Sequence, residues 1–226
     1  AVIERLEYYE RQFPDTDTEI VLFTRAAALA HLGEFAEAAR TLKTLAADHP
    51  DSELSAPAAE RAERLEEIAR AAVLSPATDN LRAYLNDLEK RRETLARIEA
   101  RLGDTIDARL ARRERERVEV ETAQALFRNR YVLEDGAAQA LERMTHIIEF
   151  HAESRLRHRH RLMLGHMYFE LARDMVNLTP PEGMRFDVAL YDRMTDAAAE
   201  EFRRVAQADG YEEKIEAAAM VDALEG

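Results

Sequence analysis

The sequence contains no cysteine and no tryptophan, and it has only 7 glycines and 6 prolines among 226 residues. The absence of cysteine excludes disulfide bonds, thiol catalysis and thiolate metal sites, and it leaves both oxidising and reducing compartments open. The few glycines never cluster, which excludes the glycine-rich loops that bind phosphate groups. No apolar run approaches ~18 residues, so the sequence predicts no membrane-spanning helix.

The residues that are abundant favour helices. Hydrophobic residues make up 46% of the chain and charged residues 34%, with Ala, Glu, Arg and Leu dominant. Apolar positions recur every three or four residues and never keep a sustained spacing of two, which predicts helices and no strands. The expected fold class is therefore all-α.

The chain is acidic, with a formal net charge of -13. A nucleic acid or an anionic bilayer would be repelled on average, so neither is an expected partner. The basic run ARRERER at 111–117 alternates arginine with glutamate. That alternation predicts a solvated helix face whose charges pair with one another.

Three helix-breaking residues, Pro14, Gly33 and Pro50, divide the first part of the chain. They interrupt the apolar periodicity, and glycine is the residue that most readily takes the left-handed conformation of a tight corner. The pattern predicts helices over 1–13, 18–32, 36–48 and 53–72. Because the first of these helices begins at residue 1, we expect the sequence to start partway into a longer precursor.

The same region contains an internal repeat. A shift of 36 residues places Pro14 on Pro50 and Leu29 on Leu65. Repeats of this period are typical of solenoids, in which helix pairs bury a continuous core only by stacking on one another.

This repeat resembles the tetratricopeptide repeat. That family carries a small residue at the first helix crossing, Gly-x-aromatic at the corner, a small residue with apolar residues four and seven positions later, and proline at the exit. The matching residues here are Ala26, Gly33, Phe35, Ala38, Leu42, Leu45 and Pro50. Leu22 lies where the family prefers tryptophan. The resemblance implies a curved stack of helix pairs whose concave side binds an extended or helical segment of a partner protein.

Looser copies of the pattern follow in the second half of the chain. The small residue and its two apolar followers recur as Ala140, Met144 and Ile147, and again as Ala198, Phe202 and Val205. An inserted loop over 177–187 precedes the last of these helices. We expect Asp187 to cap that helix, Phe186 and Tyr191 to pack beside the cap, and a closing helix to cover 212–224.

The segment between the copies lacks the repeat and has a near-heptad spacing of apolar residues. These are Leu81, Leu85, Leu88, Leu95, Leu102 and Ile106. The spacing predicts a coiled-coil-like seam. Gly103 favours a helical hairpin over 79–102 and 105–132 above the alternative of one long rod. The expected organisation is N-terminal repeats over 1–75, a long hairpin over 76–132, and C-terminal repeats over 133–226.

The sequence predicts no catalytic residue, no metal site and no cofactor. His158 and His160 are two positions apart, so a helix would point them to different sides. His146, Glu149 and Glu153 share a helix face and are the alternative candidate for a metal-dependent enzyme.

The predicted partner-binding residues are the trough-facing positions of two first helices. They are Ile20, Phe23, Ala27 and His31 in the first full repeat, and Thr122, Ala125, Asn129 and Val132 in a later one. Phe23 would hold an apolar anchor and Asn129 would hydrogen-bond a partner's backbone.

These observations favour a non-enzymatic scaffold that binds another protein or a peptide segment. The alternative is a structural protein that self-assembles through the 79–132 hairpin. The resemblance is closest to repeat proteins of the bacterial envelope, both outer-membrane assembly lipoproteins and periplasmic proteins that join a coiled coil to repeats. It favours the periplasm over the cytoplasm and leaves room for a lipid anchor upstream of residue 1, with the compartment itself left open.

Overall fold

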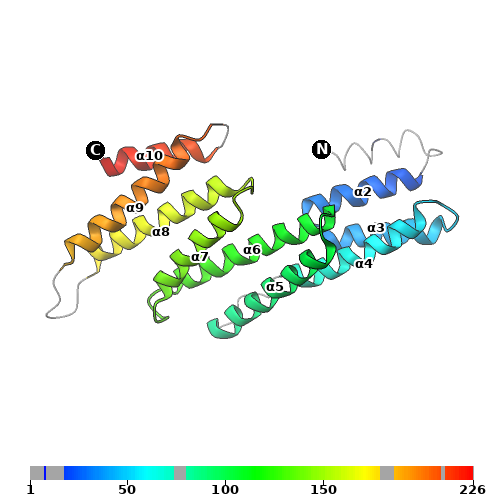
Figure 1. The fold of residues 1–226 in the computed structure, drawn as a ribbon, viewed down its shortest axis with the longest axis horizontal. Coiled ribbons are helices and arrows are strands. Elements are labelled where there is room, and N and C mark those ends of the chain that lie inside the picture. Colours follow the sequence, from blue (N-terminus) through cyan, green and yellow to red (C-terminus); the bar gives the residue numbers. More distant parts are fainter. Residues whose placement is uncertain (1–7, 9–17, 74–79, 179–185, 210–211, 226) are drawn as a thin grey trace. The chain divides into compact units, whose positions relative to one another are not determined.

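The computed structural model describes residues 8, 18–73, 80–178, 186–209 and 212–225 of the chain, and these residues form helices and no strands (Figure 1). The helices are α2 (Thr18–Leu32), α3 (Phe35–Asp48), α4 (Ser55–Ala72), α5 (Leu81–Leu102), α6 (Ile106–Arg128), α7 (Gly136–Phe150), α8 (Arg157–Asn177), α9 (Val188–Ala206) and α10 (Glu213–Glu225). The predicted all-α fold class is confirmed. The helix predicted over 1–13 lies outside the described residues, apart from Tyr8.

Local capping chemistry sets several of the helix ends. Gly33 has φ +91°, and α2 ends in the paired hydrogen bonds that accompany a left-handed glycine, from Gly33 N to Ala30 O and from Glu34 N to Leu29 O. At the start of α9, the Asp187 side chain accepts a hydrogen bond from Leu190 N at 2.9 Å, as predicted.

The middle segment forms two helices and not one rod. Gly103 follows α5 with φ +59°, and the chain resumes as α6 three residues later. Glu99 of α5 lies 2.6 Å from Arg112 and 3.0 Å from Arg115 of α6, so the two helices face each other beside the turn. The segment is therefore broken near Gly103 and is not one rod, and its second helix ends at Arg128 where the sequence predicted 132.

The chain divides into two compact units, residues 1–118 and 119–226. The division falls within α6, whereas the sequence predicted boundaries after residues 75 and 132. In unit 1, the first half of α6 is joined to α4 by ion pairs from Asp107 to Arg61 and Arg64, which places this half with the N-terminal helices.

In unit 1, α3 packs against both α2 and α4, and α4 also packs against α5 (Figure 1). The centre of this packing is the predicted set of one small and two apolar residues on α3. Ala38, Leu42 and Leu45 are all completely buried. The corner aromatic Phe35 is also buried, as its place in the pattern predicts.

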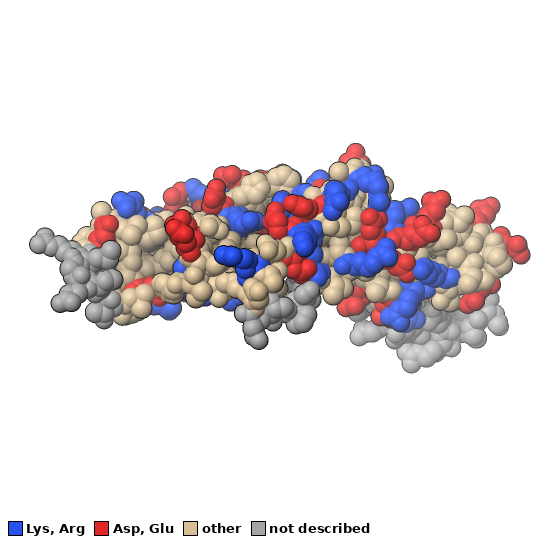
Figure 2. Space-filling view, turned by 90° about the horizontal axis from the view of Figure 1, so that it is seen from below, with Lys and Arg blue, Asp and Glu red and all other residues tan. Residues whose placement is uncertain are grey.

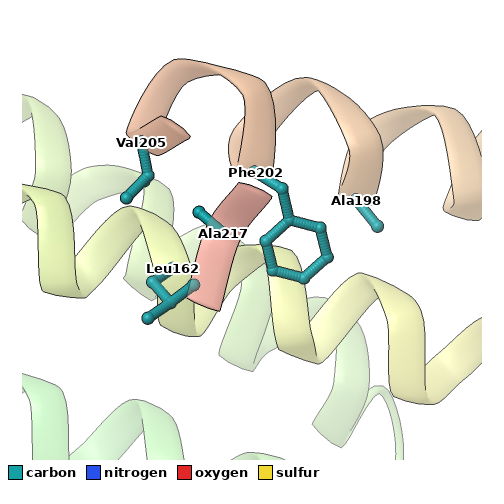
Figure 3. Close-up of a cluster of buried hydrophobic side chains, with 5 residues drawn as sticks. All are labelled: Leu162, Ala198, Phe202, Val205 and Ala217. Carbon is teal, nitrogen blue, oxygen red and sulfur yellow. The ribbon is translucent and has the colours of Figure 1, made fainter. Parts of the chain in front are cut away.

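In unit 2, α9 packs against both α8 and α10 (Figure 1). The core cluster joins Ala198, Phe202 and Val205 of α9 to Leu162 of α8 and Ala217 of α10 (Figure 3). The Phe202 ring leaves no room at Gly165 of α8, where an added Cβ would lie 2.7 Å from a ring carbon. Glycine is therefore required for α8 and α9 to approach this closely.

The pattern of one small and two apolar residues is buried in each of the three helices that carry it. Ala140, Met144 and Ile147 of α7 are at most 1% exposed, like their counterparts on α3 and α9. A shift of 102 residues places Asp135 on Gly33, and Asp135 adopts the left-handed conformation with φ +56°. Aspartate is one of the few residues with a side chain that tolerates this conformation. The two turns differ in length, since Gly33 directly follows α2 and Asp135 lies seven residues after the end of α6.

The helices that the structure describes include none with the length and apolar character needed to cross a membrane.

We expect Gly165→Ala to destabilise the protein by about 1–3 kcal/mol, because the added methyl group would overlap the fully buried Phe202 ring. On an open helix surface the same change would stabilise by up to about 1 kcal/mol, so the sign of the effect reports the close approach. Thermal or urea unfolding measures the difference.

The double variant Gly165→Ala/Phe202→Leu provides the control. The smaller leucine makes room for the methyl group, so the loss from Gly165→Ala should shrink in the Phe202→Leu background. A more stable Gly165→Ala protein would contradict the packing described for α8 and α9.

Candidate binding surface

The four predicted binding residues on α2 lie on or near its surface. Ile20 is 56% exposed and His31 is exposed, while Phe23 and Ala27 are half-buried. The guanidinium of Arg61 lies over the Phe23 ring, 5.8 Å from its centroid. An accessible face with apolar character therefore remains on α2.

The four later residues are not arranged as the motif alignment predicts. Thr122 and Ala125 are only 4% and 2% exposed, so their side chains present no surface to a partner. Helix α6 ends at Arg128, and Asn129 and Val132 lie in the turn that follows. Asn129 donates its side-chain N–H to Ala125 O at 2.8 Å, which uses the amide group at the helix end. Of the four, Val132 is the strongly exposed one, at 79%.

The basic run at 111–117 is only in part the solvated, self-paired face that its alternating charges predict. The side chains of Arg112 and Arg117 are 62% and 53% exposed, and Arg117 pairs with Glu114 at 2.8 Å. Glu114, Arg115 and Glu116 are each at most 9% exposed. One side of this run lies against other helices and not against water, because two arginines of the run bond to helix ends. Arg113 donates to His31 O at the end of α2, and Arg117 donates to Ala72 O at the end of α4, both at 2.9 Å.

These two arginines satisfy carbonyl groups that have no partner within their own helix. A cation also interacts favourably with the partial negative charge at a helix C-terminus. Four residues apart on α6, Arg113 and Arg117 share one face and serve two different helices. The first half of α6 is therefore fixed against the C-terminal ends of α2 and α4.

Asp107 is the acidic counterpart of this arrangement at the start of α6. Its carboxylate is buried, and it accepts hydrogen bonds from Arg61 Nε at 3.2 Å and Arg64 Nε at 3.0 Å, both on α4. Thr105 Oγ1 caps the same helix end by accepting from Ala108 N at 3.1 Å. Sequence analysis missed Asp107 because its partners lie more than forty positions away.

A groove runs between α4 and α5 in unit 1. It has a wider part of about 580 Å³ and an adjoining part of about 310 Å³, which share Glu67 and Arg70. The wider part ends at Arg101 and Leu102, and the adjoining part continues along α5 from Asp87 to Thr94. Sequence analysis did not predict this groove. The sequence feature that points to it is the 36-residue repeat. In that repeat the predicted trough-facing residues Ala27 and His31 correspond to Glu63 and Glu67, which line the groove.

Unit 2 contains buried histidines near the ends of α7 and α8. His151 Nε2 lies 2.8 Å from Glu119 Oε2, and both side chains are nearly inaccessible. Burial lowers the pKa of His160 to about 4, with further lowering by the charges of His151 and Arg159. His160 is therefore neutral at pH 7.

The alternative metal face is not assembled as a ligand set. Within the described ranges, no three His, Asp or Glu side chains converge as metal ligands would. The ring of His146 instead packs on Phe150, with ring centroids 5.7 Å apart.

A comparison with protein-family models and with the sequences of curated proteins finds no match for this chain. Its function is therefore inferred from the geometry of its own residues.

We expect Asp107→Ala to cost about 3 kcal/mol of unfolding free energy, because it leaves two arginines of α4 without their buried carboxylate. Urea unfolding followed by circular dichroism measures the loss. The matched control is Asp104→Ala, an exposed aspartate in the same turn, which should change stability by no more than about 0.5 kcal/mol. Equal effects of the two changes would contradict the role of Asp107.

Stability should also depend on pH through His160. The pKa of His160 is about 4 in the folded chain, whereas the ordinary pKa of 6.5 applies in the unfolded chain. Between these two pH values only the unfolded chain binds the proton. Unfolding free energy should therefore fall as the pH drops from 7.5 to 5, by about 2 kcal/mol more in the wild type than in His160→Gln. His146→Gln, at an exposed position, should keep the wild-type slope. Identical slopes in the wild type and His160→Gln would contradict this expectation.

Proposed function

We propose that this chain is a helical-repeat scaffold of the tetratricopeptide type that binds a segment of another protein and has no catalytic role. One observation carries the proposal, the burial of the same pattern of one small and two apolar residues in α3, α7 and α9. A pattern that recurs at equivalent packing positions is what a stack of repeated helix pairs requires. The left-handed corners at Gly33 and Asp135 support the same interpretation.

The repeat architecture matters for function because it leaves a face of each first helix available to a partner. On α2 this face includes the exposed Ile20 and the half-buried Phe23. A large apolar side chain that is exposed next to a half-buried aromatic ring is a common feature of protein-binding surfaces.

The cavities support binding to a macromolecule better than they support catalysis. The α4–α5 groove is open to solvent along its length and is lined mainly by charged side chains. Active sites for small molecules are usually enclosed and mostly apolar, with a few convergent polar groups.

The alternative of self-assembly through the 79–132 hairpin receives less support. Leu88 and Leu95, at the centre of the predicted seam, are completely buried within the single chain. The centre of the apolar stripe is therefore already used in intramolecular packing, although Ile106 at its end is 64% exposed. The envelope location rests on the resemblance alone and stays a prediction.

The proposal predicts that Ile20→Glu will reduce capture of the partner. Because Ile20 is 56% exposed, the change should leave the fold intact while placing a charge on the apolar face of α2. Affinity capture followed by mass spectrometry, with the wild type and the variant side by side, identifies proteins whose recovery falls at least tenfold, about 1.4 kcal/mol.

The matched control is Ile215→Glu, which makes the same change at a position that is 81% exposed on α10. A genuine partner of the α2 face should be recovered at wild-type levels by Ile215→Glu. If every captured protein is recovered equally by the wild type, Ile20→Glu and Ile215→Glu, the α2 face is not the binding surface.

A further inference from the structure

The α4–α5 groove is a built feature of unit 1 with charged walls. Residues of α4 spaced three or four apart line one wall, and residues of α5 with the same spacing line the other, so each wall is one helix face. Along α5 the lining extends from Asp87 to Leu102, which corresponds to about 22 Å of helix. An extended peptide of about seven residues has that length.

Most of the charges that line the groove already have partners on the chain. Glu67 pairs with Arg101 across the groove, and Asp87 pairs with Arg91 at 2.7 Å along α5. Two more lining charges have partners outside the groove, Glu66 with Lys43 and Arg64 with Asp107. These pairs cancel charge within the lining.

Two cations remain without a partner in the adjoining part of the groove, the part of about 310 Å³, with one on each wall. Arg70 of α4 and Lys90 of α5 are exposed, and neither makes an ion pair or a side-chain hydrogen bond with the residues that the structure describes. The one unpaired acid of the lining, Glu63, lies in the wider part. The adjoining part of the groove therefore has excess positive charge, in a protein whose net charge is -13. Figure 2 shows how closely Lys and Arg side chains mix with Asp and Glu side chains on one face of the molecule.

We propose that this groove binds an acidic segment of a partner protein, with carboxylates meeting Arg70 and Lys90 and an apolar side chain meeting the half-buried Leu102. The inference rests on the proposed scaffold function, and it adds a second binding surface and the chemistry of its occupant. Exposed cations facing each other across a channel favour an anionic chain that can reach both walls. A basic segment would meet unpaired positive charge at Arg70 and Lys90.

The test uses a seven-residue peptide in which pairs of glutamates alternate with single leucines, titrated into the isotopically labelled full chain and followed by NMR. We expect chemical-shift changes in the amides of α4 and α5 that line the groove. Raising the salt concentration should weaken binding, because the two cations are exposed. A peptide with lysine in place of glutamate should not produce these shifts.

The double variant Arg70→Glu/Lys90→Glu should weaken binding of the acidic peptide at least tenfold. Its matched control is Arg155→Glu/Arg193→Glu, which changes the charge equally at two exposed arginines of unit 2 and should bind as the wild type does. Shifts outside the groove, equal binding by both double variants, or stronger binding of the lysine peptide would each overturn the inference.

Failure of this inference is distinguishable from failure of the scaffold proposal. If the acidic peptide does not bind but Ile20→Glu still loses a captured partner, the scaffold stands and the groove is not its second surface. If the peptide does not bind and no capture depends on Ile20, both proposals fail.

Discussion

The close approach of helices at small side chains is the constraint on which the rest of this structure depends. Ala38, Ala140 and Ala198 are each fully buried and precede two larger buried residues on the same helix face. At Gly165 the approach is closer still, since even a methyl group would overlap the Phe202 ring. Interiors packed at crystal-like density have no spare volume to absorb such a group, so residue size at these few positions sets which helices can pair.

Charged side chains supply the second level of organisation, and they act at helix ends. Arg113 and Arg117 bond to the last carbonyl groups of α2 and α4, while Asp107 holds two arginines of α4. The arginines satisfy carbonyl groups that have no partner within their own helix, and the two arginines of α4 satisfy a carboxylate whose burial without a partner would cost free energy. Apolar packing alone would leave α6 free to rotate or slide along its neighbours, whereas these directional bonds specify one register.

Sequence reasoning succeeded where the determining interactions are local. The bounds of α2 match the prediction at both ends, and the corner at Gly33, the cap at Asp187 and the break at Gly103 depend on residues within a few positions. The buried patterns on α3, α7 and α9 were also predictable, because a helical period fixes which side chains share a face.

The failures share a non-local cause. Alternating arginine and glutamate on a helix has the same pattern whether it faces water or the ends of two other helices, so the burial of Glu114, Arg115 and Glu116 could not be seen in the sequence. The early end of α6 at Arg128 moved Asn129 and Val132 off the helix face on which the motif alignment had placed them. The α4–α5 groove likewise exists only once two consecutive helices pack side by side, which brings Glu67 next to Arg101, 34 positions away.

The different burial of the charges separates their roles in folding from the binding roles proposed for them. Asp107, Glu114 and Arg115 are buried, where salt screens interactions weakly. Arg70 and Lys90 are exposed. At physiological ionic strength, salt largely screens the interaction between exposed charges that are more than about 8 Å apart. A moderate rise in salt should therefore weaken any contact made by the groove while leaving the buried contact of Asp107 with α4 in place. In this chain, ionic strength should therefore act on the proposed recognition before it acts on the fold.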